Sequence, residues 1–251
     1  MFLTRRWLVF ALVVGLLTWL AVELGDWQFQ RLAERETANT QLARNLDAAP
    51  LPINELLAVG RPPNASDEWR QVTVTGTWDE ENSVVVRYRT RKGKPGVDVV
   101  TPLRTDQGAV LVDRGWMQTD NDGSHRPDLP PATDGQVTVT GRIRLDATGD
   151  STAVTDLSTR AISSKQIAKT LPYDLYGGFL DLVSESPTPE HALEPLPLPE
   201  QSNGPHFFYG LQWWFFGALA VFGFFFLAWD ERRRLREARA SAQAPTVSST
   251  N

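Results

Sequence analysis

The chain of 251 residues has a formal net charge of −5 and 41% hydrophobic residues, which permits one or two ordinary globular domains. It contains no cysteine, which excludes disulfide bonds, thiolate metal sites and a cysteine nucleophile. With three histidines and two methionines, a dedicated copper or zinc carrier is not expected, and the acidic net charge offers no basic surface for nucleic acid.

Residues 7–24 predict a transmembrane helix that follows a short cytoplasmic N-terminus at residues 1–6. The stretch is apolar except for Thr18 and Glu23, and it is long enough to cross a bilayer core of ~30 Å. A cleaved signal peptide is the alternative, because Arg5 and Arg6 match the basic start of such a peptide. The length of the stretch and the lack of a clear cleavage site favour the membrane helix.

The residues that follow predict a helical stalk at 25–49 and then a β-rich domain. The stalk has no Gly or Pro after Gly25, and Pro50 ends it. Segments that alternate β-branched and polar residues predict antiparallel strands at 70–78, 83–90, 97–103, 108–114 and 136–145. The expected fold is an α+β membrane protein in which two transmembrane helices flank an extracytoplasmic antiparallel β-barrel or sandwich-like domain.

Four local patterns within residues 25–206, the expected extracytoplasmic part, allow simple interpretations. The hexapeptide QVTVTG begins at Gln71 and again at Gln136, which fits either a duplicated half-barrel or two similar strands. Residues 120–123 resemble a calcium loop, but the missing acid at Gln118 favours a hairpin turn that also holds His125. Residues 162–169 predict a short helix, and the Pro-rich residues 186–200 predict an extended connector.

Residues 207–229 predict a second transmembrane helix, because the stretch has no charge and aromatic residues at both ends. Five arginines follow in the tail at 230–251, whereas the approach to the helix lacks Lys and Arg from residue 170 onward. Basic residues mark the cytoplasmic side of a membrane protein. Both termini are therefore expected in the cytoplasm, and the end of the tail is expected to be disordered.

A cluster of polar and aromatic residues is expected where the two helices leave the membrane. His206, Tyr209 and Trp213 share one face of the second helix, and Trp27 and Arg31 lie one turn apart on the first. If the helices pack together, this set suits a haem, with an imidazole for the iron and a guanidinium for a propionate. The alternative is that these residues only anchor the helices at the membrane surface.

Four segments of the chain resemble the surfeit-locus family of cytochrome c oxidase assembly factors, and the resemblance spans nearly everything between the two helices. The first contains Gly25, Trp27, Gln28 and Arg31, and the second is Glu68–Arg70 with the strand after it. The third runs from Gly96 to Trp116. The fourth contains His206, Tyr209, Gln212 and Trp213.

The third segment is the most specific, because a Gly-led strand, the sequence TPL, a turn and an Arg-Gly-Trp ending occur in this order. The residues concerned are Thr101, Pro102, Leu103, Arg114, Gly115 and Trp116. They fit a structural corner in which Trp116 packs under the sheet and Arg114 pairs with an acid, and a direct contact with a ligand is the alternative. The chain departs from the family's usual Asn at Asp113, its usual Lys at Arg35 and its usual approach to the histidine at Gly204 and Pro205.

The resemblance implies a non-enzymatic factor that assists haem a insertion into subunit I, the catalytic subunit of cytochrome c oxidase. It implies His206 as the haem iron ligand, with Trp27, Arg31, Tyr209, Gln212 and Trp213 around the haem. The implied partners are the membrane, subunit I and haem a synthase. The implied location is the plasma membrane of a bacterium, or the inner mitochondrial membrane of a eukaryote. The alternatives are a scaffold that binds oxidase subunits without handling haem, and an extracytoplasmic hydrolase, for which no nucleophile and base are recognised.

Overall fold

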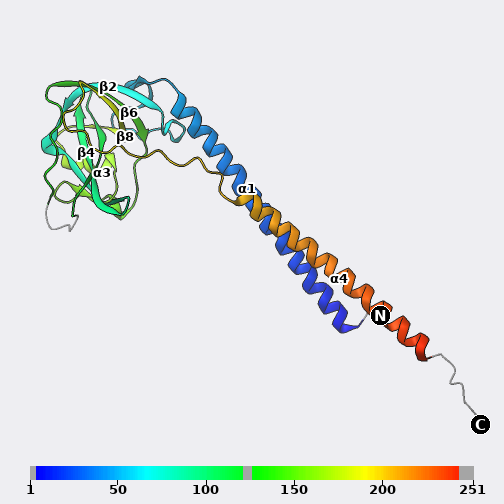
Figure 1. Ribbon diagram of the computed structural model, residues 1–251. Coiled ribbons are helices and arrows are strands. Elements are labelled where there is room, and N and C mark those ends of the chain that lie inside the picture. Colours follow the sequence, from blue (N-terminus) through cyan, green and yellow to red (C-terminus); the bar gives the residue numbers. More distant parts are fainter. Residues whose placement is uncertain (1–3, 121–125, 243–251) are drawn as a thin grey trace, which may run out of the picture. The chain divides into compact units, whose positions relative to one another are not determined.

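Two long helices and a β-rich domain make up the chain in the computed structural model, which describes residues 4–120 and 126–242 (Figure 1). One unit contains the helices up to residue 39 and from residue 201 onward, and the other contains residues 40–200. The described residues stop before the tail ends and omit residues 121–125. The predicted turn around His125 therefore lies largely outside the described residues.

The first helix, α1, runs from Arg5 to Asp47 without a break, so the predicted membrane segment and stalk form one helix. The second, α4, runs from His206 to Ala242. Each contains a stretch that is long and apolar enough to cross a membrane, and only 11% of each stretch is buried in the structure. Their exposed apolar side chains therefore need a covering other than the protein itself.

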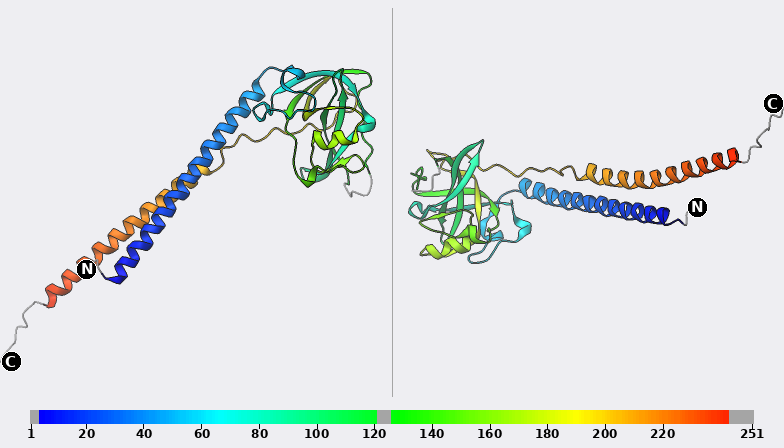
Figure 2. Two further views of the ribbon diagram at one scale, coloured as in Figure 1. Left: turned by 180° about the vertical axis from the view of Figure 1, so that it is seen from behind. Right: turned by 90° about the horizontal axis from the view of Figure 1, so that it is seen from below.

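Small residues bring α1 and α4 into direct contact along the helix pair (Figure 2). A Cβ atom at Gly25 would overlap the indole of Trp214, and one at Gly210 would lie 2.9 Å from the ring of Phe29. The rings of Phe29 and Trp214 are 4.9 Å apart between centroids. Glycine thus allows the close approach of helix backbones that is common between membrane helices.

The β-rich domain is an eight-stranded mixed sheet with the strand order β1-β2-β6-β8-β5-β4-β3-β7. The strands are β1 (Leu51–Pro52), β2 (Gln71–Trp78), β3 (Val84–Arg91), β4 (Lys94–Arg104), β5 (Ala109–Gln118), β6 (Gln136–Arg144), β7 (Ser158–Thr159) and β8 (Leu175–Ser186). The purely antiparallel prediction is wrong, because β8 is parallel to β5, β1 to β2 and β7 to β3.

The strand pairs close on themselves. Beyond the linear order, β2 also pairs with β4 through Thr77 with Arg104 and Trp78 with Leu103. The pairings therefore form a ring of β2, β6, β8, β5 and β4. Successive residues of a strand face opposite sides, so Leu111 and Val112 of β5 belong to different hydrophobic clusters. The sheet is consequently packed on both faces.

The short helices and 3-10 turns lie in the connections between the strands. They comprise α2 (Ile53–Leu56), α3 (Ser164–Ile167) and four 3-10 turns: η1 (Ala65–Asp67), η2 (Glu80–Asn82), η3 (Asp150–Thr152) and η4 (Ala168–Thr170). The helix predicted at 162–169 is thus shorter and continues as a 3-10 turn. Ile167 of α3 is fully buried in the same cluster as Leu111.

Strand β8 was not predicted from the sequence. Its Gly177 and Gly178 indicate a turn by composition, yet both lie inside a twelve-residue strand. A Cβ atom at Gly177 would overlap the backbone of Arg61, and Gly178 has φ +74° with Pro63 beside it. Only glycine allows the backbone of residues 61–63 to pass so close to the strand.

The two QVTVTG hexapeptides are neighbours in the sheet. Strands β2 and β6 run antiparallel with Val74 opposite Val139 and Thr75 opposite Thr138. The hydroxyls of Thr75 and Thr138 are 2.9 Å apart and hydrogen-bonded. The repeat therefore supplies both sides of one strand pair, with valines on the buried face and threonines on the other.

Candidate functional site

The candidate site predicted at the start of α4 centres on His206, and the structure joins this residue to α1. The Nδ1 atom of His206 lies 2.8 Å from Oε1 of Gln28, at hydrogen-bond distance. An amide oxygen can only accept, so Nδ1 carries the proton in this pair, and in the neutral ring Nε2 then keeps a free lone pair. A fixed tautomer with one available nitrogen is the state in which histidine binds a metal.

The segment before α4 holds His206 in place. The side chain of Asn39 on α1 donates a hydrogen bond of 2.8 Å to Oδ1 of Asn203. Gly204 has φ +65°, and a Cβ atom there would lie 3.3 Å from Cδ2 and 3.5 Å from Nε2 of His206. The absence of a side chain at residue 204 therefore keeps the Nε2 edge of the ring uncrowded.

The predicted residues of α1 lie in the same region, but they contact each other more than they contact His206. The guanidinium of Arg31 lies 5.6 Å from the ring centroid of Trp27, and its Nη1 is 2.9 Å from Oε2 of Glu34. Within the described residues, no hydrogen bond or ion pair joins Arg31 to His206. Both Arg31 and Glu34 are about half exposed, so this ion pair is readily exchanged for another anion.

The predicted aromatic residues of α4 offer exposed flat surfaces. Tyr209 and Trp27 are each 48% exposed, whereas Trp213 is partly buried. Gln212 is exposed. Phe207 packs edge-on against Phe29 of α1, with 6.2 Å between ring centroids. The region around His206 is thus largely apolar and open, which suits a flat hydrophobic ligand.

The TPL residues of the third segment belong to the interior of the β domain. The Thr101 hydroxyl is 2.9 Å from that of Ser83, and both residues are buried. Pro102 pairs with Leu111 of β5, and Leu103 is fully buried. These contacts give the TPL residues a packing role in the β domain.

Arg114 is held inside the domain by backbone carbonyls instead of an acid. It donates hydrogen bonds of 3.2 Å to the carbonyl of Pro130 and 2.9 Å to that of Pro131, and it lies 5.8 Å from the ring of Trp78. Burial lowers the pKa of its guanidinium, although Glu185 and Glu80 oppose that shift. Arg114 therefore fastens the 130–131 segment to β5.

Trp116 and Gly115 hold the Pro-rich connector against the sheet. The indole Nε1 of Trp116 donates a 3.1 Å hydrogen bond to the carbonyl of Arg89, and its backbone exchanges hydrogen bonds of 2.8 and 3.0 Å with Glu194. Gly115 has φ +129°, and a Cβ atom there would lie 2.6 Å from the carbonyl of Glu194. The predicted connector is therefore hydrogen-bonded to β5 at Glu194 and is not a free linker along its whole length.

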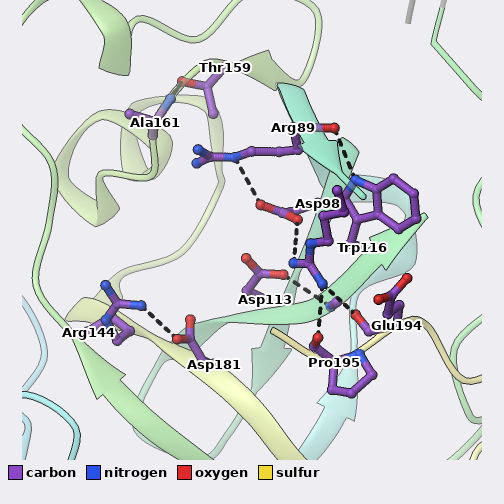
Figure 3. A network of polar contacts seen from close by, with 12 residues as sticks. Arg89, Asp98, Asp113, Trp116, Arg144, Thr159, Ala161, Asp181, Glu194 and Pro195 are labelled. Atoms are coloured by element: carbon purple, nitrogen blue, oxygen red, sulfur yellow. Dashed lines mark hydrogen bonds and ion pairs between the residues drawn. The ribbon is translucent and has the colours of Figure 1, made fainter. Parts of the chain in front are cut away.

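The β domain contains a network of buried acids and arginines that the sequence did not predict (Figure 3). Asp98 pairs with Arg89 at 2.9 Å and with Arg91 at 3.2 Å. Asp181 pairs with Arg144 at 2.7 Å. The three carboxylates of Asp98, Asp113 and Asp181 are buried, and burial raises the pKa of each.

The sequence did not predict this network because its residues are far apart in the chain. Asp113 and Asp181 are 68 positions apart and meet only because β5 and β8 run parallel as neighbours. No known spacing rule links them. Aspartates inside strands are the one sequence signal that could have indicated the network, because carboxylates are rare in strand interiors.

Comparison with known proteins shows the family of this chain. A model of the SURF1 family matches residues 15–218. SURF1-like proteins of Mycobacterium bovis and of Mycobacterium tuberculosis, both described as uncharacterized, are 33% identical over 246 residues, which cover 95% of this chain and 89% of theirs. The cytochrome oxidase assembly protein SHY1 of Saccharomyces cerevisiae is 30% identical over 98 residues, which cover 38% of this chain and 24% of that protein.

The family match includes most of α1, the whole β domain and the first part of α4, so it contains every residue of the candidate site. The resemblance that the four segments indicated is thereby confirmed, and this chain belongs to the SURF1 family.

Proposed function

We propose that this protein is an assembly factor for cytochrome c oxidase that holds haem a at the start of α4 and assists its insertion into subunit I. The single observation that carries the haem part is the pair formed by His206 and Gln28, which leaves one imidazole nitrogen available. The oxidase part is supported by family membership and by the yeast relative, whose name states that it assembles cytochrome oxidase.

The residues present fit a haem. Nε2 of His206 would bind the iron, and Gln28 would keep the ring oriented and its Nδ1 protonated. Trp27 and Tyr209 would cover the macrocycle, and Arg31 would leave Glu34 to bind a propionate. The haem would be cargo in this proposal, so these residues would bind, orient and release it.

The proposed surroundings of the site are the outer face of a membrane. The apolar stretches of α1 and α4 would cross the bilayer, and both termini would lie in the cytoplasm. Subunit I and haem a synthase would be partners within the same membrane. His206 is the first residue of α4, so a haem bound there would lie at the membrane surface. The haem would then pass to a partner in the same membrane without crossing water.

The test is the absorption spectrum of full-length protein purified in detergent from cells that make haem a. We expect a Soret band with the wild-type protein and with His191→Ala, which changes an exposed histidine of the connector. We expect its loss with His206→Ala. Gln28→Leu should weaken retention by about 10- to 100-fold, because the supporting partner of a ligand histidine has that effect.

A second candidate function is a scaffold that binds oxidase subunits through the β domain and handles no haem. The observation that favours this function is the network of buried acids and arginines in that domain, which lies apart from the His206 site. The same measurements decide between the two: haem occupancy that is unchanged in His206→Ala, together with oxidase assembly that fails when β-domain residues are replaced, contradicts the haem proposal and supports the scaffold.

A further inference from the structure

An open cavity of ≈ 520 Å³ lies over the polar network of the β domain. We call it the Asp113 cavity and define it by its charged lining: Arg89, Arg91, Asp98, Asp113, Arg144 and Asp181. Ile162, Phe179 and Leu196 supply apolar wall. It lies wholly within the unit of residues 40–200 and shares no residue with the His206 site.

Strand register brings the three carboxylates to one wall of this cavity. Asp113 on β5 and Asp181 on β8 are direct partners in a parallel pair. Asp98 comes from β4, which pairs with β5 on its other side. In Figure 3 the carboxylates of Asp98, Asp113 and Asp181 point toward the space between Arg89 and Arg144.

The positive charges in the cavity do not reach all three acids. Arg89 and Arg91 both pair with Asp98, and Arg144 divides its contacts between Asp181 and Glu68. Among the described residues, no ion pair reaches Asp113. Its Oδ1 accepts a 3.1 Å hydrogen bond from the backbone N–H of Gly115. One buried acid therefore lacks a cation.

A second observation points to a missing donor. Asp181 is 3% exposed, and its Oδ1 is buried without a hydrogen-bond partner in the described part of the chain. A buried acceptor without a donor costs free energy, so such atoms are rare and call for an explanation. Asp181 already pairs with Arg144 through Oδ2, so its unmet atom is Oδ1, whereas Asp113 accepts only the backbone hydrogen bond of Gly115 within the described residues. Each of the two carboxylates can therefore accept from one further donor.

The entrance of the cavity is strained and exposed. Tyr88 lines it with φ +63°, a conformation rare for a bulky side chain, at the point where the register of β3 and β4 shifts. Its side chain is 60% exposed. Strained backbone of this type concentrates where a protein binds something.

We propose that the Asp113 cavity receives an arginine side chain of a partner protein, whose guanidinium bonds the carboxylates of Asp113 and Asp181. A guanidinium is planar, stays charged and presents parallel donors, which match two neighbouring carboxylates. Its three methylene groups would lie against Phe179 and Ile162. An anionic ligand fits less well, because Arg89, Arg91 and Arg144 are each already paired with an acid.

Burial and the neighbouring Asp98 and Asp181 raise the pKa of Asp113, while Gly115 and Arg89 oppose that shift. Binding of a cation favours the ionised carboxylate, so the guanidinium replaces a proton, which passes to solvent. The affinity for an arginine should therefore increase with pH until Asp113 is ionised in the free protein as well.

The test titrates the full-length protein in lipid nanodiscs with the peptide acetyl-Gly-Arg-Gly-amide, labelled with ¹³C in the guanidinium and observed by NMR. The control peptide contains citrulline, which keeps the shape and lacks the charge. Asp113→Asn retains an acceptor for Gly115, and Asp106→Asn changes an exposed acid as the matched control. Asp181→Asn is the second variant should Asp113→Asn fold poorly.

We expect the arginine peptide to bind the wild type and Asp106→Asn, and to bind more tightly at pH 8 than at pH 6. Binding of the citrulline peptide, and of the arginine peptide to either cavity variant, should be weaker by at least about tenfold. Equal binding of the two peptides, no binding of the arginine peptide, or unchanged binding by both cavity variants would overturn the proposal. So would displacement of the peptide by calcium, which would indicate a metal site.

Discussion

At Asp113 the fold encloses a carboxyl group that is 1% exposed, beside the acids Asp98 and Asp181. The family resemblance leads to the expectation of asparagine at this position. The physical setting explains why an amide is the easier choice: it keeps an acceptor for Gly115 and has no charge to bury. Nothing in the sequence around residue 113 reveals that two other acids face it.

The raised pKa of Asp113 has a consequence for stability. An acid whose pKa is higher in the folded state than in the unfolded state stabilises the fold fully below its unfolded value of 3.8, and this contribution is lost as pH rises toward the folded value. We therefore expect Asp113→Asn to gain in melting temperature relative to the wild type as pH increases from 4 upward. Thermal unfolding of both proteins across this pH range measures it, with Asp106→Asn as control. Parallel curves for wild type and Asp113→Asn would contradict this.

Individual site residues were predicted best where the signal comes from neighbouring residues in the sequence. The histidine at the start of α4 was identified from aromatic and apolar residues that follow it directly. Its partner Gln28 was named only through family resemblance, because the hydrogen bond joins residues 178 positions apart. The expected ion partner for a ligand, Arg31, instead contacts Trp27 and Glu34 on its own helix.

At the scale of elements, the pattern of β-branched residues predicted five of the strands to within a few residues. Burial alternates along β2 and β6, whereas β4 and β5 are buried at nearly every position. The sequence pattern failed for β8, whose Gly177 and Gly178 break it for reasons that only the neighbouring backbone explains. That one strand decides the topology: it pairs antiparallel with β6 and parallel with β5. The antiparallel prediction was wrong for this physical reason.

The helix pair allows a matched test of its glycine contacts. Gly210→Leu should push Phe29 aside and weaken the contact of α1 with α4 by about 1–3 kcal/mol, as overpacking does. Gly223→Leu changes a glycine of the same helix that has open space beside it. Because the chain has no cysteine, Asn39→Cys with Asn203→Cys reports the contact as a disulfide. We expect slower disulfide formation with Gly210→Leu only; equal rates for both leucine variants would refute the glycine contact.

For the whole molecule, the two apolar helices and the arginines after the second predict one orientation in a membrane. A single cysteine at Asp106 of the β domain should react with a membrane-impermeant maleimide in intact cells. One at Arg239 near the end of α4 should react only after the membrane is permeabilised. Gel-shift labelling of the two variants measures this, and labelling of Arg239→Cys in intact cells would reverse the assignment.

The ring of strand pairings limits how this domain can meet other chains. Each of the strands β2, β6, β8, β5 and β4 pairs with at least two others, so none of them is an edge strand of the sheet. An unpaired border invites another polypeptide to add a strand and begin aggregation. Here the sheet's borders are strands of two residues, β1 and β7. The exception is β3, because β7 pairs with only Val85 and Val86 of its eight residues. Pairing with the backbone of another chain is thus confined to the rest of β3, and the other strands of the ring are recognised through their side chains.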